Sequence, residues 1–388
     1  MLAGKGSLGL VYTVGKNVAP ESDAGVFSLL GYDPLTIHLA RGVVEALGAG
    51  VNFQDGDLAL RAGFATVEGD RLVDRRAGRN LSTEEARELA SAINKELRLK
   101  EGIRFEFHST VGHRAVVVFH HGNFDFSSNI SNFDPAYVRK GNVSIAIPSK
   151  KNYELPMCEP LDKKPGTIKS AALINEFGYK VRDILDKHPT NTRRRREGKL
   201  AANWILMRDA GTEKPKIPSF REKWGMAAAM IADLPVELGI GKLLQMEVEQ
   251  LEPGTSLEGY NTRAKLALSL VKNHDFVYVH LKGPDEPGHD GMMDLKKQRI
   301  EEIDAGFFQV LAKSKEVDDI IVCVTCDHST PWRDKAHSDD PVPVLLVNHD
   351  SSTTKNLTHR FSEMDAKNGS LGIIQSGRMI LEQLKSEI

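Results

Sequence analysis

The fold is decided by residues 276–291, FVYVHLKGPDEPGHDG. The apolar run from Phe276 to Leu281 is typical of a short buried strand, and it leads directly into a loop that carries glycine, Asp and His. The arrangement recurs in residues 320–331, IIVCVTCDHSTP, where Ile320 to Val324 predicts a second strand. Polar loops that follow buried strands indicate an α/β fold whose site lies at the carboxyl ends of the strands.

The flanking segments extend this pattern through the C-terminal half of the chain. Helical spacing of apolar residues predicts helices over 262–273 and 295–313, and residues 342–347, VPVLLV, predict a third buried strand. Strands that alternate with helices favour a doubly wound, mostly parallel sheet.

Residues 57–185 show a different, α+β pattern and are predicted to form an inserted domain. One helix is expected near 83–98, opened by a capping box of Ser82 and Glu85, and a hairpin is expected at Gly112-His113. The remaining expected elements are strands at 61–67, 71–75, 105–110 and 114–120 and a helix at 170–187. The α/β core is then 1–56 together with 186–388, and it includes a strand at 202–207.

Composition excludes several classes of protein. The 388 residues hold 51 Lys and Arg against 53 Asp and Glu, a net charge of −2, which argues against a nucleic-acid partner. No apolar run reaches the roughly 18 residues of a membrane helix, so no membrane partner is expected. Three cysteines cannot form a disulfide framework, which favours a cytoplasmic location. The sequence leaves the oligomeric state open.

Three polar clusters supply residues suited to metal binding. They are Asp285 with His289, the pair Asp327 and His328, and His337 in KAHSDDPVPV. Asp and His offer the O and N ligands that suit Zn or Mn, and five such ligands could hold two ions. A single cluster of this kind is more often a set of helix caps and turn residues, but three clusters near strand ends favour metal binding.

Three further features of the sequence can be explained without a role in metal binding. The run Arg193 to Arg196 is interpreted as a solvated helix end, with phosphate binding as the alternative. Cys323 and Cys326 have CxxC spacing, but Cys323 lies within an apolar strand, so both are expected to be buried small hydrophobic residues. His113, at the hairpin tip, is an ordinary turn histidine or an acid or base of the inserted domain.

The motifs GPDEPGHDG, TCDHSTP and KAHSDDPVPV resemble the metal-binding segments of cofactor-independent phosphoglycerate mutases of the archaeal type, which belong to the alkaline phosphatase superfamily. The segment PESDAG, residues 20–25, is similar to the nucleophile segment of that family, and LGYDP follows it. Further similar segments are RG at 41–42, EALGAG at 45–50, FATV at 64–67 and VDRRAGR at 73–79. The resemblance extends from about residue 8 to the C-terminus.

The resemblance implies an alkaline-phosphatase-like α/β core and two divalent cations, with Mn²⁺ or Mg²⁺ expected and Co²⁺ or Zn²⁺ as alternatives. It implies that Asp285, His289 and His337 hold one cation. It implies that Asp327, His328 and the hydroxyl of Ser22 hold the other, with Ser22 as the nucleophile. Similarity to the family also makes four arginines candidates for substrate contacts, against solvation as the simpler interpretation: Arg75, Arg76, Arg79 and Arg208.

The chain departs from the family pattern at its start. Members of the family begin with an apolar strand that ends in Asp-Gly and supplies another carboxylate to the second metal, and nothing before Ser22 matches it. We therefore expect a truncated N-terminus, through a late gene start or a real loss. The family also commonly has a His four residues after the nucleophile, where this chain has Val26.

The resemblance implies an isomerase of glycolysis and gluconeogenesis that interconverts 3-phosphoglycerate and 2-phosphoglycerate through phospho-Ser22. The inserted domain is then expected to close over the substrate and retain the glycerate. Two alternatives stay open. One is a metal-dependent phosphohydrolase or another phosphomutase of the same superfamily, and the other is a homologue without activity.

Overall fold

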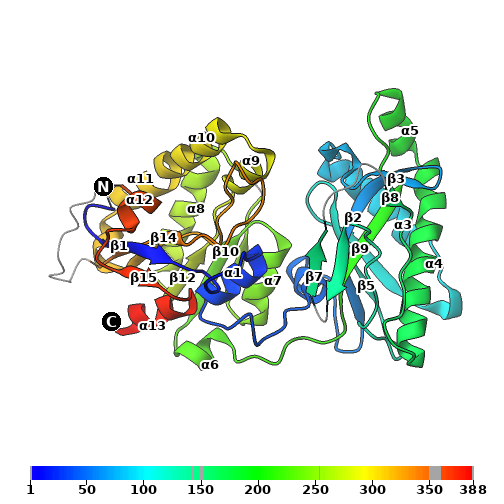
Figure 1. Cartoon of the computed structure of the whole chain (residues 1–388), viewed down its shortest axis with the longest axis horizontal. Helices are drawn as coiled ribbons and strands as arrows, with labels where there is room; N and C mark the ends of the chain where they lie inside the picture. Colours follow the sequence, from blue (N-terminus) through cyan, green and yellow to red (C-terminus); the bar gives the residue numbers. More distant parts are fainter. Residues whose placement is uncertain (1, 141–142, 148–152, 253, 349–359, 387–388) are drawn as a thin grey trace. The chain divides into compact units, whose positions relative to one another are not determined.

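The computed structural model describes residues 2–140, 143–147, 153–252, 254–348 and 360–386 (Figure 1). The chain divides into two compact units. Unit 1 comprises Met1–Ile37, Ile217–Asp233 and Leu244–Ile388, and unit 2 comprises His38–Lys216 and Leu234–Leu243. The sequence predicted domain boundaries at 56/57 and 185/186. In the structure, residues 38–56 and 186–216 belong instead to unit 2, the inserted unit, and not to the core.

Unit 1 contains a parallel, three-stranded sheet in the order β11-β10-β12. Helix α8 lies between β11 and β12 in the sequence, and its Ser256 N-cap accepts a hydrogen bond from the amide of Gly259. Tyr260 and Ala264 of α8 pack in one hydrophobic core with Ala229 and Ile231 of β10. The bounds are β10 Ala228–Ala232, β11 Glu247–Gln250, β12 Phe276–Val279 and α8 Leu257–Leu270.

A second sheet of unit 1 has the order β13-β14-β1-β15 and is mixed. β14 is antiparallel to both β1 and β13, whereas β1 and β15 are parallel. The expectation of one mostly parallel sheet was therefore wrong for this half, because a buried apolar run such as VPVLLV has the same pattern in either direction. The bounds are β1 Ser7–Val11, β13 Val322–Val324, β14 Val342–Val347 and β15 Gly372–Ile374.

The two strands that precede the ligand loops are both edge strands among the described residues. β12 is bonded to β10 on one side only, and β13 to β14 on one side only. Every residue of both strands is half-buried, whereas every residue of β10 and β14 is buried. The expected strands at 276 and 320 are confirmed, but they belong to different sheets.

The helices of unit 1 largely follow the predicted spacing. The helix expected over 295–313 is present as α10 and α11, joined by a π-helical turn over Asp304–Phe308. Helices α1 and α13 pack beside the mixed sheet, where Leu29 and Ile380 share a core with Val11 and Val344. The helices and turns of this unit are α1 Ser22–Leu29, α6 Phe220–Trp224, α9 Asp285–Asp290, α10 Met293–Ile303, α11 Gln309–Lys313, α12 Glu363–Ala366, α13 Arg378–Ser386 and a 3-10 turn at Lys315–Asp319.

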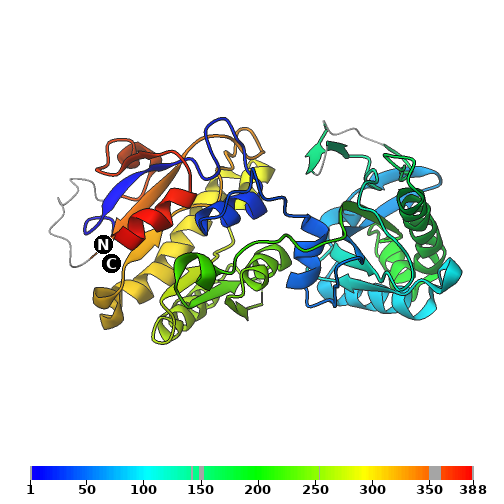
Figure 2. The same ribbon diagram turned by 90° about the horizontal axis from the view of Figure 1, so that it is seen from below.

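Unit 2 is built on an antiparallel sheet around the long strand β2, Leu58–Glu68, which pairs with β5, β3 and β9. Helices α3 and α4 cover one face of this sheet, and α2 covers the other (Figures 1 and 2). The other strands are β3 Arg71–Asp74, β4 Phe105–Ser109, β5 Arg114–Phe119, β6 Tyr137–Lys140, β7 Val143–Ala146, β8 Tyr153–Glu154 and β9 Trp204–Gly211. The helices are α2 Arg41–Gly48, α3 Thr83–Glu96, α4 Pro165–Lys187, α5 Pro189–Arg196 and α7 Pro235–Leu243, with 3-10 turns at Ala77–Arg79 and Lys100–Gly102.

Two glycines allow α2 and α7 to approach closely. A Cβ on Gly48 would lie 1.7 Å from the carbonyl oxygen of Pro235, and a Cβ on Gly239 would lie 1.9 Å from that of Val44. Backbone contacts this short exclude any side chain, so Gly48 of the EALGAG segment has a packing role.

The local predictions for unit 2 hold. The capping box of Ser82 and Glu85 opens α3, and β4 and β5 form the expected hairpin. The strand expected at 202–207 is present as β9, but it pairs with β2 of the inserted unit. A short apolar strand does not reveal which sheet it joins, which explains the misplaced boundary. None of the helices in the described ranges combines the length and apolar character that crossing a membrane requires.

Candidate functional site

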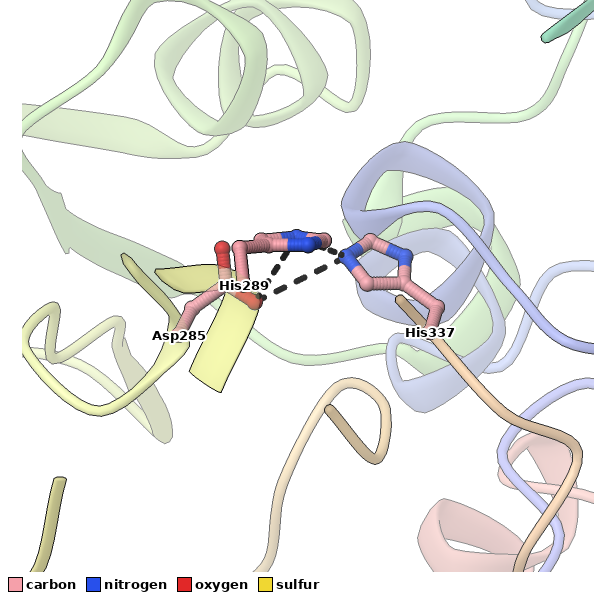
Figure 3. A group of neighbouring side chains, drawn as sticks. All are labelled: Asp285, His289 and His337. Carbon is pink, nitrogen blue, oxygen red and sulfur yellow. Dashed lines mark hydrogen bonds and ion pairs between the residues drawn. The ribbon is translucent and has the colours of Figure 1, made fainter. Parts of the chain in front are cut away.

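Three of the predicted metal ligands meet in unit 1 (Figure 3). Asp285 and His289 lie on the short helix α9, which follows β12, and His337 lies on the loop before β14. The Nε2 atoms of His289 and His337 are 3.1 Å apart. Oδ1 of Asp285 lies 3.4 Å from Nε2 of His289 and 3.6 Å from Nε2 of His337. In the described part of the chain, this is the one His/Cys/Asp/Glu cluster with the spacing of a three-residue metal site.

The donor set and its spacing fit a divalent cation. Ligands about 2.1 Å from one ion are separated from one another by roughly 3.0–3.4 Å in tetrahedral or octahedral sites. Nδ1 of His337 faces the carbonyl oxygen of Pro20 at 2.8 Å, and Nδ1 of His289 faces that of Lys335 at 3.1 Å. These backbone partners leave both Nε2 atoms directed at the cluster, which is the usual support of metal-binding histidines.

The protonation state of Asp285 also fits a cation site. Burial alone would raise the pKa of Asp285, but hydrogen bonds from His337 and Thr330 outweigh burial and hold that pKa well below its ordinary value. Burial lowers the pKa of His337, but Asp285 outweighs this effect and raises the pKa of the imidazole. The carboxylate is therefore ionised at neutral pH and available to a cation.

The second predicted group, Ser22, Asp327 and His328, is also brought together. Ser22 is the first residue of α1, and its Oγ lies 3.1 Å from Nε2 of His328. Nε2 of His328 lies 3.3 Å from Oδ2 of Asp327. A Cβ on Gly25 would lie 2.2 Å from the carbonyl oxygen of Asp327, so the glycine of PESDAG lets α1 rest against the loop after β13.

The two groups are adjacent. The rings of His328 and His337 stack with their centroids 3.7 Å apart. Burial raises the pKa of Asp327, but His328 and other cationic groups outweigh this effect, so the pKa of the carboxyl is lowered. Burial also lowers the pKa of His328, which favours a neutral imidazole. All five predicted ligands and the predicted nucleophile thus form one cluster in unit 1.

Sequence reasoning missed Thr330, which joins the two groups. Its hydroxyl donates to Oδ1 of Asp285 at 2.7 Å and lies 3.0 Å from Nδ1 of His328. The DHST segment contained the residue, but a Thr in a loop carries no signal that separates this role from an ordinary turn.

The predicted arginines lie in unit 2, including Arg208, which the sequence had placed in the core. Arg75 donates to both carboxylate oxygens of the buried Asp134, at 3.1 and 2.7 Å. Arg208 donates to Oδ2 of the same carboxylate at 3.0 Å. The guanidinium carbon of Arg208 lies 4.1 Å from the centre of the Tyr137 ring. Asp134 and Tyr137 therefore fix two of the four predicted arginines.

Further arginines that were not predicted extend this group. Arg61 of β2 lies opposite Arg208 of β9, and its Nε is 3.2 Å from Oε1 of the buried Glu45. Arg41 donates to the same oxygen at 2.8 Å. Burial, followed by the charge of Arg41, lowers the pKa of Arg61 to about 10. A single Arg in an alternating strand is ordinarily solvent-facing, so no local pattern distinguishes Arg61.

The excess of positive charge continues into the turn at 77–79. Burial, followed by the charges of Arg79 and Arg75, lowers the pKa of Arg76. Positive charges this close together disfavour one another's protonated forms, and a bound anion would relieve that repulsion. The chemistry of this region, called here the arginine group, is that of an anion-binding surface. It comprises Arg41, Arg61, Arg75, Arg76, Arg79, Arg114 and Arg208.

His113 faces this positive charge. Burial, followed by the charges of Arg114, Arg76 and Arg61, lowers the pKa of His113 to about 3. The imidazole is therefore neutral at neutral pH, and it cannot act there as a cationic acid.

This pKa shift predicts an acid-sensitive contribution to stability. The unfolded chain binds a proton at His113 below about pH 6.5, whereas the folded chain does so only near pH 3, so folding loses stability as pH falls between these values. His113→Gln should lose less stability than the parent between pH 7.5 and 5, by roughly 1–2 kcal/mol in urea unfolding. His274→Gln, which removes a histidine paired with Glu247, is the control. Parallel losses in the parent and H113Q would contradict the assignment.

The remaining motifs have structural roles. Arg194 of the four-arginine run is fully buried and donates to Glu85 at 2.7 Å and to the side chain of Asn80 at 2.6 Å. The interpretation as a solvated helix end was therefore wrong for this residue. Its neighbour Arg195 is half exposed and pairs with Asp186. Cys323 and Cys326 are free and half-buried.

Comparison with known proteins gives consistent matches. A family model described as 2,3-bisphosphoglycerate-independent phosphoglycerate mutase matches residues 3–191. The chain is 43% identical to the protein of that name from Aeropyrum pernix, over 97% of this chain and 90% of the relative. It is 37% identical to the one from Methanopyrus kandleri, over 99% of this chain and 87% of the relative.

Two solved structures are also similar. A Pyrococcus horikoshii protein aligns with a TM-score of 0.75 and 29% identity, covering 99% of this chain and 87% of that one. The cofactor-independent phosphoglycerate mutase of Thermoplasma acidophilum aligns with a TM-score of 0.61 and 33% identity, covering 100% of this chain and 90% of that one.

Proposed function

Because this chain belongs to the family of 2,3-bisphosphoglycerate-independent phosphoglycerate mutases, we propose that it interconverts 3-phosphoglycerate and 2-phosphoglycerate through a phosphoserine at Ser22. The observation that carries the proposal is the hydroxyl of Ser22, 3.1 Å from His328 and beside two groups of metal ligands. The same ligand groups, at the ends of α/β strands, support an alkaline-phosphatase-like architecture for unit 1. A cytoplasmic location is proposed from the reaction.

Asp285, His289 and His337 would hold one divalent cation, and Asp327, His328 and Ser22 would hold the other. Mn²⁺ or Mg²⁺ is expected, and Co²⁺ or Zn²⁺ suits the same ligands. Bound cations lower the pKa of a coordinated hydroxyl and neutralise charge on a phosphoryl group.

Ser22 supplies the attacking oxygen. The Ser22 hydroxyl loses its proton as a bond forms between its Oγ and phosphorus and the bond from phosphorus to the glycerate oxygen breaks, and the released alkoxide takes up a proton in exchange. The other hydroxyl of the bound glycerate then attacks the phosphoserine, and Ser22 is restored. The amides in the first turn of α1 favour the negative charge that the phosphoserine places there.

The arginine group of unit 2 is proposed to bind the carboxylate of the glycerate and to retain it between the two transfers. Arg75 and Arg208 contribute planar donors fixed by Asp134. Retention decides the outcome, because a phosphoserine left without glycerate is hydrolysed to free phosphate.

Arg208→Met should therefore shift the products from isomer to inorganic phosphate. We expect the Michaelis constant for 3-phosphoglycerate to rise roughly tenfold or more, and the phosphate share to increase, in ³¹P NMR with Mn²⁺ present. Asp134 keeps Arg75 as a partner, so the variant should fold. Arg195→Met, which removes an exposed arginine of the same unit, is the matched control.

Three other outcomes would contradict parts of the proposed function. Unchanged product ratios and an unchanged Michaelis constant in R208M would remove Arg208 from the substrate site. Free phosphate as the main product of the parent would favour a phosphohydrolase. Absence of both products and of phospho-Ser22 with every metal would favour a homologue without activity.

A further inference from the structure

The hydroxyl of Thr330 stands between the nucleophile and the first ligand group. It is 4% exposed, and it contacts both Oδ1 of Asp285 and Nδ1 of His328. On its other side, the His328 ring reaches the hydroxyl of Ser22 through Nε2. Thr330 is thus the one described side chain that hydrogen-bonds to both Asp285 and His328.

The directions of these hydrogen bonds follow from their chemistry. A hydroxyl has a single proton, and a carboxylate only accepts, so the proton of Thr330 is directed to Asp285. The oxygen of Thr330 can then only accept from His328, which requires a proton on Nδ1. In a neutral imidazole with a proton on Nδ1, Nε2 carries the lone pair. That lone pair faces Ser22 and also Oδ2 of Asp327, which lies 3.3 Å away. Thr330 thus holds the proton on Nδ1 against a carboxylate that would attract it to Nε2.

We propose that Thr330 is a positioning residue, which fixes His328 as the Nδ1–H tautomer with Nε2 open toward Ser22 and orients Asp285 for its cation. This inference rests on the proposed roles of Ser22, His328 and Asp285. It assigns a function to a residue outside the predicted ligand set, through its hydrogen bonds to two of those ligands. Loss of an outer partner of this kind typically lowers metal affinity by about 10 to 100-fold.

The backbone of Thr330 is held independently of its hydroxyl. Its carbonyl oxygen accepts a hydrogen bond from Nζ of Lys296 at 2.8 Å, and it lies 2.7 Å from where a Cβ on Gly288 would be. The neighbouring Ser329 is bridged to Ser338. Removing the hydroxyl alone should therefore leave the loop in place.

The test compares the parent with Thr330→Val, Thr330→Ser and Thr325→Val. Valine keeps the shape of threonine without the hydroxyl, and serine keeps the hydroxyl. Thr325, in the same loop as Thr330, is the matched control, since its hydroxyl donates to the carbonyl of Pro343 in β14. The tautomer of His328 is determined in metal-free protein by long-range ¹H–¹⁵N correlation, and Mn²⁺ affinity is determined by calorimetry.

We expect the Nδ1–H tautomer in the parent, T330S and T325V, and a shift toward Nε2–H in T330V. Mn²⁺ affinity should fall about tenfold in T330V and recover in T330S. An Nε2–H tautomer in the parent would overturn the proposal even if T330V failed to fold. Unchanged tautomer and affinity in T330V would also overturn it, as would a T330S variant that behaves like T330V.

Failure of the proposed function is recognised separately. If phospho-Ser22 never forms in the parent but the tautomer and the Mn²⁺ affinity still depend on the Thr330 hydroxyl, the phosphoserine mechanism is wrong and the positioning role of Thr330 stands.

Discussion

Replacing Ser22 with alanine is expected to lower mutase turnover by roughly 10⁴-fold or more, because removal of a nucleophile leaves only the contribution of binding and charge stabilisation. The hydroxyl of Ser22 is the proposed attacking group, and it lies 3.1 Å from Nε2 of His328. Turnover is measured with saturating Mn²⁺, and phosphorylation of the intact protein is followed by mass spectrometry. No phosphoprotein should form in S22A.

Ser28→Ala is the matched control for this variant. Ser28 lies on the same helix, is fully buried, and its hydroxyl has no hydrogen-bond partner among the described residues. Its removal should leave turnover and folding nearly unchanged. Phosphorylation of S22A at the parent's rate would show that another residue is the nucleophile.

Replacing His337 with alanine is expected to weaken binding of the first cation by roughly tenfold or more, since the site loses one of three protein ligands. The substitution also removes the contact from Nδ1 to the carbonyl of Pro20, two residues before Ser22. Phosphorylation of Ser22 should therefore slow even when Mn²⁺ is raised to saturation.

Calorimetric titration with Mn²⁺ measures the affinity, and His274→Ala provides a histidine variant of unit 1 outside the ligand cluster. H274A should bind Mn²⁺ like the parent. Equal affinity in H337A and the parent would mean that the three residues do not share an ion.

The candidate metal ligands could be selected from the sequence because their pattern is local. Asp285 and His289 are four residues apart after an apolar strand, and Asp327 and His328 are adjacent after another, so strand prediction alone brought them to strand ends. Helix α3 was equally local, since Ser82 and Glu85 form its capping box within three residues.

The missed residues depend on contacts between distant segments. Arg61 of β2 gains its significance from its position opposite Arg208 and from its ion pair with Glu45 of helix α2. Thr330 gains its role from Asp285, 45 residues away. Similarly, the antiparallel direction of β14 and the sheet that β9 joins are properties of pairing, and an apolar run of five or six residues is compatible with either choice.

The half-buried edges of β12 and β13 bear on how the protein behaves at high concentration. Among the residues that the structure describes, each strand pairs with another strand along one side only, and its side chains are mostly apolar. Such edges are where aggregation by strand addition begins, and proteins commonly protect them with charges, proline or a covering segment. Phe276–Val279 and Val322–Val324 contain none of these charges or prolines. The strands that carry the ligand loops, like the uncharged edge strand β15, are therefore segments of unit 1 at which self-association by strand addition can begin.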